Sequence, residues 1–180
     1  MRGLRGVLVG LSCAATTACV GAVNSFVPDG AARFAPELLG TWTDSASTER
    51  AVITQAGPRQ YAIVYTDYRG DTKRYLGLLG RAGARQVLDV QPDAPSEDDP
   101  ERLHVAIILD TIGPRIVIAV LERDTLTAYL EANPRAIAHR RTKDSLVLTA
   151  GSKELAGFLS AYLRRPGALG DASTWIRRAP

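Results

Sequence analysis

Sulfur is almost absent from this chain of 180 residues, which contains two cysteines, Cys13 and Cys19, and a single methionine, Met1. Both cysteines lie close to the start, so the long remainder of the chain can form no disulfide. A thiolate metal site in that remainder is excluded for the same reason. A folded domain must therefore be stabilised by a packed core, and about 160 residues are enough to build one.

Residues with recognisable chemistry are equally scarce. There are only two histidines, His104 and His139, and no third ligand follows either at the spacing of a metal site. The chain has no Gly-x-Ser-x-Gly elbow, no Ser-x-x-Lys, no P-loop and no dinucleotide fingerprint. The acidic run at 97–101 lacks the glycine spacing of a calcium loop and is typical of a solvated loop. We therefore predict no metal, no cofactor and no identifiable catalytic residue.

A hydrolase nevertheless stays among the hypotheses, because carboxylates distant in the sequence can meet in space and only geometry decides whether they do. The candidates are Asp89, Asp110 and Glu122.

Excess charge is also lacking. The formal net charge is +3, and Arg2 and Arg5 lie in a segment interpreted below as a signal peptide, which leaves 3 − 2 = +1. The other basic residues are scattered or lie near the C-terminus, without the dense basic face and interleaved aromatics of a nucleic-acid-binding surface. We therefore predict no nucleic-acid partner.

The first residues have the layout of a secretory signal peptide. Two arginines precede an apolar, uncharged stretch at 6–15, and small residues then lead to Ala18 and Cys19. The sequence Thr16-Thr17-Ala18-Cys19 resembles a bacterial lipobox, in which the cysteine is lipidated and becomes the first residue. Thr16 departs from that pattern, which usually has leucine there. We predict a signal peptide at 1–18 and a lipid on Cys19.

Two alternatives remain for the same segment. Cleavage after Val20-Gly21-Ala22 also fits the small-residue rule and would release a soluble secreted protein. A retained membrane helix is disfavoured, because the stretch is too polar and too rich in glycine. With lipidation, residues 19–34 are expected to form a tether. The protein would then lie in the bacterial cell envelope, at the outer membrane or on the periplasmic face.

After the expected tether, short runs rich in β-branched and aromatic residues alternate with glycine, proline and aspartate, which is typical of strands. Short links between them favour antiparallel hairpins. We predict a mainly β fold, an antiparallel meander forming a barrel-like or strongly curled sheet. The expected strands are 41–44, 50–55, 60–66, 73–80, 86–91, 104–110, 115–121, 136–141 and 146–149.

Two helices are expected to interrupt this meander and to act as lids on the sheet. One lies near 124–133, with Asp124 as its cap, and the other near 152–163, with Ser152 as its cap. The second has a continuous apolar stripe without the basic polar face of a membrane-surface helix. A single β-rich domain is thus predicted at 35–165, followed by a C-terminal tail at 166–180.

The segment Leu38-Leu39-Gly40-Thr41-Trp42 follows a short helical turn and begins the first expected strand. It resembles the G-x-W element of lipocalins, in which the tryptophan closes one end of an antiparallel barrel. The resemblance implies a structural role for Gly40 and Trp42. The second lipocalin motif is not found at its proper distance, so no ligand residue is carried over. Several later segments, among them 146–150, resemble a family of uncharacterised bacterial secreted lipoproteins.

These observations favour a non-catalytic envelope protein that binds a small apolar ligand, a lipid or another envelope protein. A barrel or lidded sheet offers an enclosed apolar concavity suited to that role. The alternative is a structural or assembly scaffold without a ligand cavity, and a hydrolase is the third hypothesis.

Overall fold

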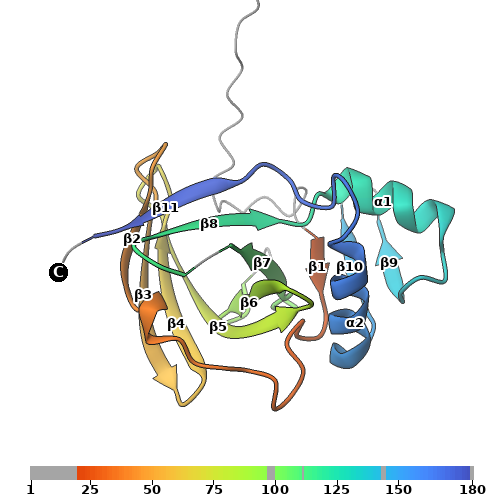
Figure 1. Cartoon of the computed structure of the whole chain (residues 1–180), viewed down its shortest axis with the longest axis horizontal. Coiled ribbons are helices and arrows are strands. Elements are labelled where there is room, and N and C mark those ends of the chain that lie inside the picture. Colours follow the sequence, from red (N-terminus) through yellow and green to blue (C-terminus); the bar gives the residue numbers. More distant parts are fainter. Residues whose placement is uncertain (1–19, 97–99, 111, 143–144, 179–180) are drawn as a thin grey trace, which may run out of the picture.

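The computed structural model of the chain describes residues 20–96, 100–110, 112–142 and 145–178 (Figure 1). Eight antiparallel strands form a closed barrel in the order β11-β2-β3-β4-β5-β6-β7-β8. The predicted mainly β fold with a meander forming a barrel is therefore confirmed. The strands are β2 (Gly40–Asp44), β3 (Arg50–Gly57), β4 (Gln60–Thr66), β5 (Thr72–Ala82), β6 (Arg85–Pro92), β7 (Val105–Leu109), β8 (Arg115–Val120) and β11 (Ser173–Arg177).

Side-chain alternation assigns the two faces of the barrel wall. In β4, Tyr61, Ile63 and Tyr65 are buried inside the barrel, and the residues between them are half-buried on the outside. Period-two alternation of this kind is what a strand needs when one face lines a core. Strand β4 begins and ends where the sequence predicted, and most of the other predicted strands differ by a few residues at their ends.

A second layer lies against the outside of the barrel (Figure 1). It consists of a small sheet in the order β1-β10-β9, together with two helices. Its elements are β1 (Val20–Ala22), β9 (His139–Arg141), β10 (Leu146–Leu148), α1 (Arg123–Ala132) and α2 (Ser152–Tyr162). No helix among the described residues is long and apolar enough to span a membrane.

Helix α2 packs on the outside of β5, and both helices contribute side chains to the core between the barrel wall and the second layer. In α2, Leu155 and Leu159 are fully buried and Tyr162 nearly so. They share one hydrophobic core with Val87 and Ile108, whose side chains point outward from the barrel wall. The predicted lids are thus confirmed, and they cover the side of the barrel. Burying each large apolar side chain contributes about 1.5 to 3 kcal/mol.

Both predicted helix caps were wrong by a small margin. The cap of α1 is Glu122, whose carboxylate accepts a hydrogen bond from the Thr125 N–H, while Asp124 is exposed beside Arg123. The cap of α2 is Gly151, and its N–H donates to the Glu154 carboxylate at 3.3 Å. A glutamate side chain thus accepts a backbone hydrogen bond at the start of both helices, from the cap position in α1 and from three residues after the cap in α2.

Residues 20–34, which were expected to belong to a tether, are packed on the domain. Strand β1 pairs in parallel with β10, and Phe26 and Val27 are buried. The polar residues that suggested a flexible segment form hydrogen bonds instead, since the Asn24 amide donates to the carbonyl of Ala150 at 3.0 Å. Val27 lies where Gly80 leaves room, because a Cβ at Gly80 would be 2.7 Å from Val27 Cγ2.

The C-terminal segment also differs from expectation. Residues 173–177, predicted as part of a tail, form β11, which pairs with β8 on one side and with β2 on the other and so closes the barrel. Its inward residue Trp175 is only 3% exposed. The domain predicted at 35–165 therefore includes the described residues on both sides of that range.

Candidate functional site

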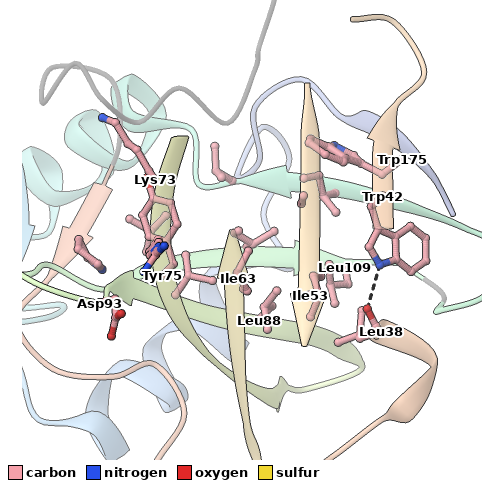
Figure 2. Close-up of a pocket in the computed structure, with 18 of the residues that line it drawn as sticks. Leu38, Trp42, Ile53, Ile63, Lys73, Tyr75, Leu88, Asp93, Leu109 and Trp175 are labelled. Atoms are coloured by element: carbon pink, nitrogen blue, oxygen red, sulfur yellow. Dashed lines mark hydrogen bonds between the residues drawn. The ribbon is translucent and has the colours of Figure 1, made fainter. Parts of the chain in front are cut away.

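The barrel encloses an apolar cavity of about 520 Å³ (Figure 2). Its walls are the inward-facing side chains of all eight barrel strands, most of them aliphatic. Both tryptophans of the chain, Trp42 and Trp175, also line it. The aliphatic lining includes Ile53, Ile63, Leu88, Val90, Val105, Ile107, Leu109, Ile116, Ile118 and Val120.

One end of this cavity is closed. The chain enters β2 through a 3₁₀ helix (Pro36–Leu38), and Leu38 lies beneath Trp42, whose indole Nε1 donates to the Leu38 carbonyl at 2.9 Å. Just before that helix, Phe34 stacks on Tyr61 with ring centroids 5.3 Å apart. The Ala35 N–H donates to the Tyr61 hydroxyl at 2.7 Å. Burial raises the pKa of the Tyr61 phenol, so the hydroxyl stays protonated in this plug.

The G-x-W residues lie at this closed end. Trp42 is fully buried, and Gly40 has a φ of +125°, a conformation that other residues rarely adopt. Arg177 is the register partner of Trp42, and its guanidinium donates to the Leu39 carbonyl at 2.7 Å. A Cβ at Gly40 would be 3.3 Å from the Arg177 Nε. The absence of a side chain at Gly40 thus leaves room for the Arg177 side chain to lie over the start of β2.

The opposite end of the cavity reaches the surface. All exposed lining residues gather there, at the start of β5 and just after β6: Arg74, Asp93, Ala94 and Ser96. Lys73 lies on the same face of β5 as Tyr75 and is half-buried, and Figure 2 shows both with Asp93, opposite the end that holds Trp42 and Leu38. Lys73 forms no ion pair with any described residue. We call this the open end.

The structure does not assemble the candidate carboxylates into one site. Asp89 points outward from the barrel yet is buried, because the N-terminal segment covers it. It accepts hydrogen bonds from the Ser25 hydroxyl at 2.6 Å and the Phe26 N–H at 3.3 Å, and contacts His104 Nδ1 at 2.9 Å. Since the carboxylate lies between serine and histidine, the imidazole does not activate Ser25 as a nucleophile. The cluster instead fastens the N-terminal segment to the barrel.

The remaining candidates make separate local contacts. Glu122 caps α1, and the backbone carbonyl of Asp110 accepts from the Gln86 amide. His139 Nδ1 is 2.9 Å from the Ile137 carbonyl, and Glu101 pairs with Arg140. The other acids of the 97–101 run, like Cys19, lie outside the described residues. Within the described ranges, no three histidine, cysteine or acidic side chains come together as a metal site.

The sequence analysis did not identify Asp44 and Glu49 as buried polar residues. Both are buried where β2 ends and β3 begins, and Asp44 is the register partner of Trp175. Asp44 Oδ1 is buried without a hydrogen-bond partner in the part of the chain that the structure describes. Alternation from Trp42 predicts an inward Asp44, but an aspartate at the end of a strand is more typical of a turn.

Comparison with known proteins gives no match to a family model, a curated protein or a solved structure. The fold and the site together define a closed antiparallel β-barrel with an internal apolar cavity, closed at one end and open at the other.

Proposed function

We propose that the barrel is a non-catalytic binding module that holds a small apolar ligand, such as a lipid tail, in its internal cavity. The observation that carries this proposal is the cavity itself. Its volume of about 520 Å³ lies within the range of roughly 300 to 1,000 Å³ that is typical of ligand pockets. A well-packed core would leave only voids close to the size of a water molecule.

The lining favours an elongated amphiphile. Aliphatic and indole side chains surround the interior, and the closed end leaves one route of entry. At the open end Lys73 offers a cation to an acidic head group. The resemblance of the Gly40–Trp42 element to lipocalins supports the same interpretation. A scaffold role without ligand is the alternative, and a hydrolase is third, because the candidate carboxylates make separate contacts.

The two tryptophans provide a direct test, since both line the cavity and the chain contains no others. Adding palmitate to the unlipidated domain should change the intrinsic fluorescence in a saturable manner. Val90→Phe fills the cavity from β6 and should weaken binding by at least about tenfold, a loss of about 1.4 kcal/mol. Ile176→Phe adds similar bulk on the outward face of β11, where Ile176 is 42% exposed, and should leave binding unchanged.

Two results would contradict the proposal. If neither palmitate nor the uncharged hexadecanol changes the emission of the wild-type domain, the cavity is not a ligand site and the scaffold alternative gains support. If Val90→Phe binds as tightly as Ile176→Phe, the ligand lies elsewhere on the protein.

We also propose that the protein is an envelope lipoprotein anchored through Cys19. The packing of β1 supports this choice over the alternative cleavage site. Cleavage after Ala22 would remove all of β1, whose three residues are buried and paired with β10. Cleavage before Cys19 retains them. Mass spectrometry of the N-terminus from the native host should find a lipidated Cys19, and an unmodified start at Val23 would refute the anchor.

A further inference from the structure

We propose that the anchor on Cys19 holds the open end of the cavity at the bilayer surface, so that a membrane lipid enters the barrel directly from the bilayer. This inference rests on the proposed function, and it names both the partner surface and the source of the ligand. It follows from the way Val20, Gly21 and Ala22 pack on the domain.

The first step is that no flexible segment separates Cys19 from the domain, because the next residue is already packed. Val20 is in register with Leu146 and is only 3% exposed. Two residues later, the Ala22 N–H and carbonyl both form hydrogen bonds of 2.8 Å with the backbone of His104. The residue next to the lipidated cysteine is therefore already part of the sheet. A flexible segment of 14 residues could instead have reached about 50 Å.

The second step is that β1 lies beside the open end. Gly21 packs directly on Leu103, because a Cβ at Gly21 would be 2.9 Å from Leu103 Cδ1. Leu103 lines the cavity and precedes β7, next to the rim residues that follow β6. The Cα of Cys19 is at most about 7 Å from that of Gly21, since two residues extend no further. Because Ala22 pairs antiparallel with His104, β1 lies along the wall at the start of β7, and a lipid on Cys19 holds this wall, with the adjoining rim, close to the bilayer.

The third step is the character of the rim. The turn between β4 and β5 lies at the open end and carries Tyr68, whose side chain is 53% exposed and is covered on one face by Arg69 at 5.2 Å. Tyrosine with a neighbouring cation suits the head-group layer of a membrane. The rim also holds acids, with Asp93 beside Lys73 and Arg74. We therefore attribute attachment to the anchor and expect a zwitterionic bilayer to suffice.

The test lengthens the anchor. A flexible insert of twelve Gly and Ser residues between Cys19 and Val20 would let the domain move about 20 Å from the membrane. The same insert between Pro58 and Arg59, in the exposed turn between β3 and β4 at the closed end, is the matched control. Each lipidated protein is placed in phosphatidylcholine vesicles that contain pyrene-labelled fatty acid. Uptake into the barrel is followed as energy transfer from tryptophan to pyrene.

We expect the wild type and the control to take up the probe equally fast, and the variant with the lengthened anchor to be slower by about tenfold, because its effective concentration at the bilayer falls. The unlipidated forms of all three should bind palmitate equally. If the three lipidated proteins take up the probe equally fast while their unlipidated forms bind palmitate normally, the inference about the anchor is wrong. The proposed function would then still stand. If unlipidated wild type does not bind palmitate, the proposed function fails and the inference falls with it.

Discussion

Removing residues 171–180 should prevent the domain from folding into a stable monomer. The deletion takes away β11, which bridges β8 and β2, and so leaves two unpaired strand edges in an open sheet. It also removes Trp175, which is 3% exposed, and loss of a buried aromatic side chain alone costs about 3 to 5 kcal/mol. Since domains are stable by only about 5 to 15 kcal/mol, little stability would remain.

The measurement is size-exclusion chromatography with a thermal melt by circular dichroism, on the chain that starts at Val20. The truncated chain should aggregate or show no cooperative transition. Deleting only residues 179–180, which leaves all of β11 in place, should have little effect. A truncated chain that remains monomeric and melts like the full domain would show that β11 does not hold the barrel closed.

Replacing Trp42 by alanine should destabilise the domain by about 3 to 5 kcal/mol. The indole is fully buried at the closed end, and its Nε1 donates to the Leu38 carbonyl. Its loss would enlarge the cavity and leave that carbonyl without its donor. Trp42→Phe keeps one aromatic ring but loses the indole N–H and part of the ring volume, so its cost should be smaller, about 1 to 3 kcal/mol. Urea unfolding of both variants supplies the free energies.

Comparing the two variants separates the stability contributed by the buried aromatic ring from that contributed by the indole hydrogen bond. A loss below about 1 kcal/mol for Trp42→Ala would mean that the site collapses around the missing ring, and that Trp42 does not secure the closed end.

The strands that could be predicted are those in which alternation is strong. In β4, three buried residues alternate with four half-buried ones, and its bounds follow directly from the sequence. Strands β1 and β11 escaped prediction because each lacks this signal. Strand β1 has three small or apolar residues, all buried, next to the predicted signal peptide. Strand β11 buries only Trp175 and ends at an arginine, which resembles a solvated tail.

The cavity could be predicted only as a property of the fold class. Inward residues such as Ile53, Leu88 and Ile118 have the same pattern whether opposite walls touch or leave a space between them. Alternation shows which face of a strand is inside, and barrel geometry determines how much room remains. Trp42 was identified because glycine and tryptophan in one short element are distinctive. The plug formed by Phe34 on Tyr61 carries no such signal, because its partners are distant in the sequence.

The most direct test of the binding proposal locates a bound ligand by NMR. With labelled methyl groups and unlabelled palmitate, nuclear Overhauser effects should connect the acyl chain to the inward methyls of Ile53, Leu88 and Ile118. The outward methyls of Val52 and Ile176 serve as the internal control and should show none. Contacts confined to outward methyls, or no contacts at a saturating palmitate concentration, would contradict the proposal that the barrel binds its ligand inside.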